Sequence, residues 1–145
     1  MLVQLKLKHL LNRHGYEFDL DDESDGTRRL LDLLPMLFMT KNNNAVFFVD
    51  EIDRSLHTKL AKFLLDEFIR LTGESNNQII FTAHDVCLLS PPPLGREEVW
   101  FIEKNEMGES VFRPLSDFPA HEKQDTLKAY LNGRFGAVPI IGRER

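Results

Sequence analysis

The sequence predicts an α/β fold with mainly parallel core strands, flanking helices and peripheral hairpins. Two short runs rich in valine, isoleucine and phenylalanine, residues 45–49 and 78–82, indicate core strands. The first run is apolar enough to be buried on both faces of a parallel sheet. Residues 28–40 and 54–71 carry apolar side chains at helical spacing, which indicates amphipathic helices alternating with the strands.

Composition bounds the class of protein. The 145 residues are 42% hydrophobic and 28% charged, which fits one soluble domain with a real core. No apolar run approaches the ~20 residues of a membrane span, and residues 1–6 lack signal-peptide features, so we expect a cytoplasmic protein without membrane contact. The net charge of -5 argues against a broad nucleic-acid face, so nucleic acid is expected only through other parts. A single cysteine, Cys87, excludes an internal disulfide and is expected to be a packing residue.

The remaining segments predict peripheral elements. Alternating residues at 3–7 and 16–20 indicate a hairpin, and the apolar runs at 99–102 and 111–112 indicate another around a turn that contains Gly108.

One further helix can be placed, and a proline falls inside one of the helices already named. Pro35 lies inside the helical pattern of residues 28–40, so a kink or break is expected near Leu34. Residues 122–132 indicate a closing helix. Three prolines at 91–93 stiffen a connection, and residues 41–44 form a turn into the first core strand.

Polar side chains follow both core strands. Asp50 and Glu51 end the first strand, and Thr82 and His84 end the second, so these side chains are expected at the same edge of the sheet. Ligands in open α/β sheets bind beyond the carboxyl ends of strands, so these residues lie where a phosphate-bound metal and an attacking water would be handled. Taken alone, the acidic pair fits equally well a strand that leaves the core into a solvated turn. A histidine in such a place is more often structural than catalytic.

A glycine-containing turn precedes the helix of residues 28–40. Ser24 or Asp25 can cap this helix, and Gly26 lets another group approach the backbone at its start. Free N–H groups at a helix N-terminus form a natural anion site. Taken alone, this segment is better explained as an ordinary capped helix after an acidic loop than as an anion site.

The order of these motifs resembles the C-terminal half of an ABC-type ATPase. It is most similar to the SMC-like ATPases, often grouped as AAA-family proteins, of bacterial phage-defence and abortive-infection systems. The resemblance spans Tyr16 to Pro139, and the matching phrases are ESDGT (23–27), VDEIDRSLH (49–57), QIIFTAH (78–84), FIEK (101–104) and GRFGAVP (133–139).

The resemblance assigns roles to the strand ends. It implies that Asp50 of the Walker B motif holds Mg²⁺ through water, and that Glu51 is the general base that polarises the attacking water. It implies that His84 contacts the γ-phosphate of ATP and senses its loss.

The resemblance also implies contacts across a dimer. Ser24, Asp25, Gly26 and Thr27 would form the signature loop, which binds a nucleotide held mainly by the opposing subunit. Ser55, Leu56 and His57 would form the D-loop at the dimer interface. Most transporter-type members have aspartate where this chain has His57 and glycine where it has Asp25.

A phosphate loop of the form Gly-x-x-x-x-Gly-Lys-Ser/Thr does not occur in the 145 residues. We therefore expect residues 1–145 to be a C-terminal lobe whose Walker A lobe comes from elsewhere, in a homodimer or a complementary chain. The isolated chain should hydrolyse little ATP, and an apolar, unpaired sheet edge should invite association. An effector protein is a further expected partner.

Two other interpretations remain open. The chain could be a non-catalytic dimerisation or effector-docking module derived from an ATPase. It could also be a metal-dependent nuclease that uses Asp50, Glu51, Asp53 and His84.

Overall fold

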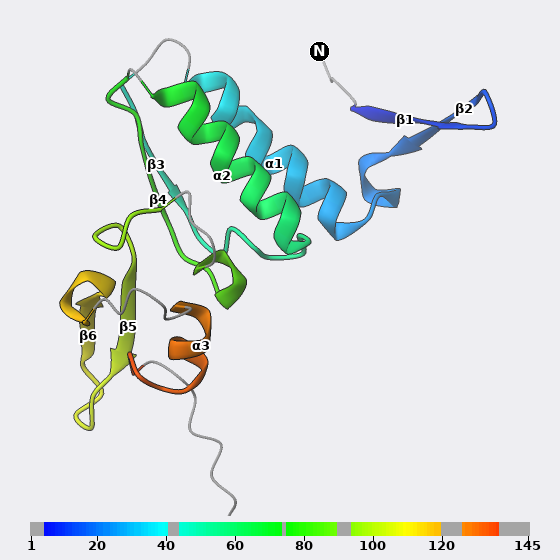
Figure 1. Ribbon diagram of the computed structural model, residues 1–145. Coiled ribbons are helices and arrows are strands. Elements are labelled where there is room, and N and C mark those ends of the chain that lie inside the picture. Colours follow the sequence, from blue (N-terminus) through cyan, green and yellow to red (C-terminus); the bar gives the residue numbers. More distant parts are fainter. Residues whose placement is uncertain (1–4, 41–43, 74, 90–93, 120–125, 137–145) are drawn as a thin grey trace, which may run out of the picture. The chain divides into compact units, whose positions relative to one another are not determined.

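The computed structural model describes residues 5–40, 44–73, 75–89, 94–119 and 126–136. The chain divides into two compact units, residues 1–84 and 85–145 (Figure 1). Most of the expected turn at 41–44, the prolines at 91–93 and the first residues expected for the closing helix lie outside the described residues. The mixed α/β class is confirmed in the described part.

The first unit begins with a hairpin, as expected, but its first strand extends to Leu11, well beyond the expected residues 3–7. Strands β1 (Lys6–Leu11) and β2 (His14–Asp19) pair antiparallel. The turn between them is two residues long, and Asn12 and Arg13 both have positive φ, as a type I′ turn requires. A short 3₁₀ segment, Leu20–Asp22, leads from this hairpin to the first helix.

Helix α1 (Asp25–Met39) runs through Pro35 without the break expected near Leu34. Proline removes one backbone hydrogen bond from a helix interior. Here its ring is exposed, while the opposite side of the helix carries the buried residues Leu33, Met36 and Leu37. Burial on both sides of the proline in sequence holds the two halves of the helix in one piece.

The centre of the first unit is a pair of parallel strands, β3 (Val46–Val49) and β4 (Gln78–Phe81), connected by helix α2 (Thr58–Thr72). The ring of Phe47 packs edge-on against Phe68 of α2, with centroids 5.8 Å apart. Helix α1 lies beside α2 (Figure 1). This is the only parallel pair among the described strands, so the mainly parallel core expected from the sequence is limited to it.

One face of this pair is exposed, which corrects the expectation that the first core strand is buried on both faces. Val46, Phe48 and Ile80 are 49%, 77% and 53% exposed. Phe48 and Ile80 are direct partners in the strand register. These three residues form an apolar patch on the surface of the unit, called here the open sheet face.

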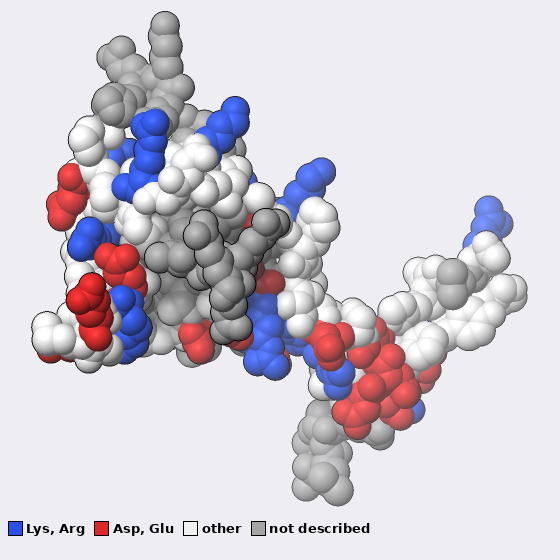
Figure 2. All heavy atoms as spheres, turned by 90° about the horizontal axis from the view of Figure 1, so that it is seen from below, with Lys and Arg blue, Asp and Glu red and all other residues white. Residues whose placement is uncertain are grey.

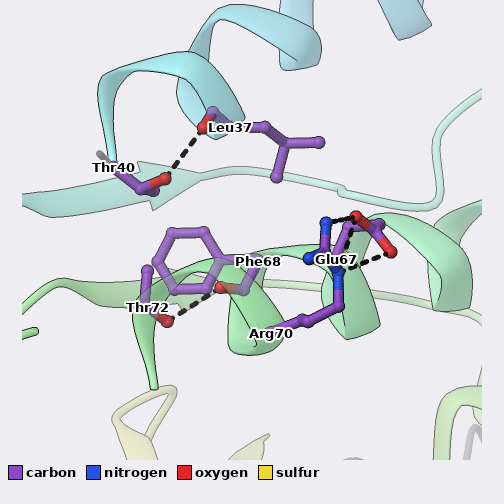
Figure 3. A network of polar contacts seen from close by, with 6 residues as sticks. All are labelled: Leu37, Thr40, Glu67, Phe68, Arg70 and Thr72. Carbon is purple, nitrogen blue, oxygen red and sulfur yellow. Dashed lines mark hydrogen bonds and ion pairs between the residues drawn. The ribbon is translucent and has the colours of Figure 1, made fainter. Parts of the chain in front are cut away.

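Buried threonines end both helices without leaving a polar group unpaired (Figure 3). The Thr40 hydroxyl donates to the Leu37 carbonyl, and the Thr72 hydroxyl donates to the Phe68 carbonyl, both at 2.8 Å. Asn77 then donates to the Thr40 carbonyl and accepts the Ala45 N–H, both at 2.9 Å. The end of α1 and the start of β3 are therefore tied to the start of β4.

The second unit contains the other expected hairpin, β5 (Trp100–Lys104) and β6 (Ser110–Pro114). Helix α3 (Thr126–Leu131) and two 3₁₀ segments, Val86–Leu89 and Leu115–Asp117, complete it. Its core is aromatic: the ring of Phe101 stacks on the rings of Tyr130 and Phe135, with centroids 5.4 and 5.3 Å away.

Cys87 does not pack in a core as expected: it is exposed. The buried member of its 3₁₀ segment is Leu88, because a turn this short can direct few side chains inward. Among the described helices, none is both long enough and apolar enough to cross a membrane.

Candidate functional site

The carboxyl ends of β3 and β4 bring a carboxylate and an imidazole together. Nε2 of His84 lies 3.4 Å from Oε1 of Glu51. The parallel pairing of the strands places both residues at one edge, since parallel strands end on the same side of a sheet. The expectation that these two residues lie at the same edge of the sheet is confirmed.

Thr82 links the two strand ends. Its hydroxyl donates to Oδ1 of Asp50 at 2.6 Å and accepts the backbone N–H of Glu51 at 2.8 Å. Its carbonyl accepts the N–H of Ile52 at 2.9 Å, and Ile52 is fully buried. The Asp50 carboxylate is therefore oriented by the neighbouring strand. The sequence marked Thr82 as polar at a strand end but gave no sign of this role.

Glu51 has a left-handed backbone conformation with φ of 48°, and so does Ser55, with φ of 59°. Residues other than glycine rarely adopt such angles. Arg29 of α1 contacts this turn: its Nη2 donates to the carbonyls of Asp50 at 2.7 Å and Glu51 at 2.9 Å. The contact joins residues 21 and 22 positions apart, which no sequence pattern indicated.

Asp53 supports the histidine rather than joining a carboxylate cluster. Its Oδ2 accepts the backbone N–H of His84 at 3.0 Å. Within the described residues, no group of three or more His, Cys, Asp or Glu side chains could hold a metal ion. The four-residue nuclease set considered from the sequence is thus not assembled as a metal site here.

The turn before α1 is a capped helix start that lies against the loop after β3. Ser24 is the N-cap, and its Oγ accepts the Thr27 N–H at 3.2 Å. Asp25 accepts a 2.6 Å hydrogen bond from Arg28. A Cβ added to Gly26 would lie 2.8 Å from the carbonyl oxygen of Ser55. The expected close approach at Gly26 is therefore present, and the approaching group belongs to the same chain.

The other two residues expected in the D-loop have local structural contacts. Nδ1 of His57 accepts the N–H of Lys59 at 3.1 Å, which makes His57 the N-cap of α2. Leu56 is half-buried, and its N–H donates to the Asp53 carbonyl at 3.1 Å.

Two open hollows adjoin the site. The first, of about 430 Å³, lies along the end of β3 and includes Asp50, Glu51, Arg29 and Arg54 in its lining. The second, of about 330 Å³, is lined by Asp25, Arg28, Arg29, Asp32, Arg54 and Ser55. Both linings contain arginine and acidic side chains, so neither hollow is purely cationic.

The surface around the site has mixed charge. The side chain of His84 is 84% exposed and that of Glu51 is 42% exposed. Acidic side chains also gather on the face shown in Figure 2, and the sequence from Asp19 to Asp25 contains five of them. Exposure of this degree means that water and salt weaken the electrostatic interactions of the pair.

A family model matches residues 3–90, which is more than half of the chain. Its description is "AAA domain, putative AbiEii toxin, Type IV TA system". The chain belongs to this AAA family. No curated protein sequence matches the chain.

The matched segment of the AAA domain contains every candidate site residue, from Ser24 to His84. It also contains Arg29 and Thr82, which the structure adds to the site. Most of the second unit, after residue 90, lies beyond the match.

Proposed function

We propose that this AAA domain supplies the metal-binding and general-base part of an ATP-hydrolysing site in a dimeric ABC-type ATPase. The observation that carries the proposal is the 3.4 Å approach of His84 to Glu51 beside an Asp50 carboxylate held by Thr82. Phosphoryl transfer to water requires one acidic side chain that holds a metal and a second that activates the water. An imidazole beside them can contact the phosphate.

The residues present fit Mg²⁺ bound together with ATP. Mg²⁺ in nucleotide sites is usually held by one or two carboxylates, with waters and phosphate oxygens as its other ligands. Asp50 provides one such carboxylate, and its orientation is fixed through Thr82. Mg²⁺ neutralises charge on the phosphates when bound. In this arrangement Glu51 accepts a proton from the attacking water, and His84 donates a hydrogen bond toward the terminal phosphate.

The exposure of Glu51 and His84 supports the proposal that a second chain or lobe covers the site. Electrostatic stabilisation of a transition state is strong only where water is excluded. Glu51 and His84 are 42% and 84% exposed, so another chain or lobe would have to cover them. We propose that a Walker A lobe, in a homodimer or a complementary chain, supplies both this cover and the phosphate loop.

The signature-loop assignment belongs to the same proposal. Ser24 to Thr27 would meet the nucleotide of the opposing subunit through backbone N–H groups at the start of α1. Arg28 partly offsets the negative charge of Asp25 by its 2.6 Å contact. Ser55 to His57 would lie at the interface beside this loop. The family description names a toxin of a type IV toxin–antitoxin system, so we propose that turnover drives a defence effector.

A Glu51→Gln substitution tests the function in the assembly that contains this chain and a phosphate loop. Turnover should fall by about 10²–10⁴-fold, because the general base is lost while the shape of the side chain is kept. ATP should still bind, and an ATP-bound dimer should accumulate. Glu67→Gln is the matched control, because Glu67 lies on α2 and pairs with Arg70. Full turnover in the Glu51→Gln variant would refute the proposal.

The open sheet face favours a second candidate function, a non-catalytic dimerisation or effector-docking module. Val46, Phe48 and Ile80 are large apolar side chains on the surface, and such patches often mark interaction sites. A module of this kind would tolerate Glu51→Gln and lose its association when Phe48 is replaced by a charged residue.

A further inference from the structure

The side chain of Arg29 donates hydrogen bonds to the backbone of the turn that contains the proposed general base, Glu51. Its Nη2 donates to the Asp50 carbonyl at 2.7 Å and to the Glu51 carbonyl at 2.9 Å. The two rotatable bonds between these consecutive carbonyls are those that define φ and ψ of Glu51. A single donor bound to both carbonyls therefore restricts the backbone conformation of Glu51 and the direction of its side chain.

The conformation that Arg29 holds is unfavourable in isolation. A left-handed conformation costs a residue other than glycine roughly 1–2 kcal/mol, and Glu51 has φ of 48°. Nε of Arg29 is also buried and has no hydrogen-bond partner within the described part of the chain. Unfavourable features of this kind persist where the surrounding structure enforces them, and they gather at functional sites.

The turn is held from two sides. On the β4 side, the Thr82 hydroxyl accepts the N–H of Glu51. On the α1 side, Arg29 binds the carbonyl of the same residue. With both ends of Glu51 fixed, its carboxylate is directed to within 3.4 Å of His84. Loss of Arg29 would leave only the Thr82 side in place.

We propose that Arg29 is a positioning residue: it holds Glu51 in the left-handed conformation and so directs the carboxylate toward His84 and the attacking water. The catalytic consequence rests on the proposed ATPase function. The effect on the turn itself can be measured without ATP hydrolysis.

The first experiment measures amide hydrogen exchange in the chain. Arg29→Ala should speed exchange at the amides of Glu51 and Ile52 by about tenfold or more, because their hydrogen bonds to Thr82 then open locally. The amide of Leu64, in the core, should exchange as before. Arg70→Ala is the control, since it removes an arginine of the same unit whose ion pair is with Glu67 on the surface of α2.

The second experiment measures kinetics in the assembly that contains a phosphate loop. Arg29→Ala should lower kcat by about 10²-fold and leave the KM for ATP within about twofold, because a misdirected base affects the reaction step and not binding. Arg29→Lys keeps a donor at the end of a long side chain, so its kcat should lie between those of the wild type and Arg29→Ala. If Arg29→Ala does not fold, the exchange rates and kcat of Arg29→Lys decide whether Arg29 positions Glu51.

The outcomes separate the two proposals. If Glu51→Gln abolishes turnover while Arg29→Ala changes neither exchange nor kcat, the role of Arg29 is overturned and the ATPase function stands. If exchange accelerates in Arg29→Ala but Glu51→Gln keeps full turnover, the hold on the turn is supported and the ATPase function fails.

Discussion

The hydroxyl of Thr82 uses both of its hydrogen-bonding capacities on two adjacent residues of the neighbouring strand end. It donates to Asp50 at 2.6 Å and accepts from the N–H of Glu51 at 2.8 Å. The proposed metal ligand and the proposed base therefore share one support, and a change in that support should affect both.

Replacement of Thr82 by valine keeps the size of the side chain and removes both hydrogen bonds. We expect the Mg²⁺ concentration for half-maximal ATPase activity of the assembly to rise by about tenfold, because the Asp50 carboxylate is no longer oriented. The free energy of unfolding should fall by about 1 kcal/mol. Thr82→Ser keeps the hydroxyl and should behave like the wild type. A valine variant with an unchanged Mg²⁺ titration would contradict the role given to Thr82.

Leu64 is fully buried between α2 and the rest of the first unit, and Leu64→Ala should destabilise that unit by about 2–5 kcal/mol. Urea unfolding followed by far-ultraviolet circular dichroism measures the loss. The single tryptophan, Trp100, lies in the second unit and would not report it. Phe63→Ala, at a side chain 54% exposed on the same helix, should cost far less. Equal losses at the two positions would show that burial at α2 is not what stabilises the unit.

The open sheet face should make the chain associate. We expect sedimentation velocity to show concentration-dependent self-association, and Phe48→Lys to weaken it by at least about tenfold, because Phe48 is 77% exposed at the centre of the apolar patch. Phe63→Lys, on the helix surface, controls for a general effect of added charge. A chain that stays monomeric at every concentration would rule out this patch as a self-association surface.

The pair of Glu67 and Arg70 gives a pH-dependent contribution to stability. The hydrogen bond from Arg70, aided by its positive charge, holds the pKa of Glu67 below its usual value, although partial desolvation opposes this effect. Ionised Glu67 therefore stabilises the fold above its pKa in the unfolded chain, and this contribution is lost as pH falls through the lower pKa of the folded state.

Glu67→Gln should accordingly lower the Tm slightly at neutral pH, and the difference from wild type should vanish in acid. The effect is small because the pair of Glu67 and Arg70 on α2 (Figure 3) is open to water, with the Arg70 side chain 65% and the Glu67 side chain 26% exposed. Thermal melts across a pH series measure it. A difference that grows toward acid pH would reverse the sign assigned here.

The sequence predicted which strands, helices and hairpins exist because each has a strong local pattern, but the first strand and the start of α2 lie several residues later than expected. Val46–Val49 and Gln78–Phe81 were placed from their apolar runs, and the shared rim of Glu51 and His84 followed from parallel pairing. The exposure of Phe48 could not be predicted in this way. A run of apolar residues shows that a strand can be buried on both faces, not that another element covers the second face.

The residues that support the site could not be predicted from local sequence patterns. Arg29 contacts carbonyls of residues 21 and 22 positions later, and any arginine on a helix surface looks the same in the sequence. Pro35 was expected to break its helix because proline removes a helix hydrogen bond. That local rule takes no account of tertiary packing, and here Leu33 and Leu37 are buried on either side of the proline. The roles of Asp50, Glu51 and His84 remain predictions that the experiments above test.

The left-handed turn at Glu51 has a consequence for the evolution of this protein. A glycine here would relieve roughly 1–2 kcal/mol of backbone strain and lose about 0.5–1 kcal/mol through its greater freedom in the unfolded chain. Glu51→Gly should therefore melt at a slightly higher temperature than the natural chain while being unable to activate water. Selection for robustness alone would favour that change. With Glu51 in place, the domain is less stable than it would be with glycine, but it has a carboxylate at the position that faces His84.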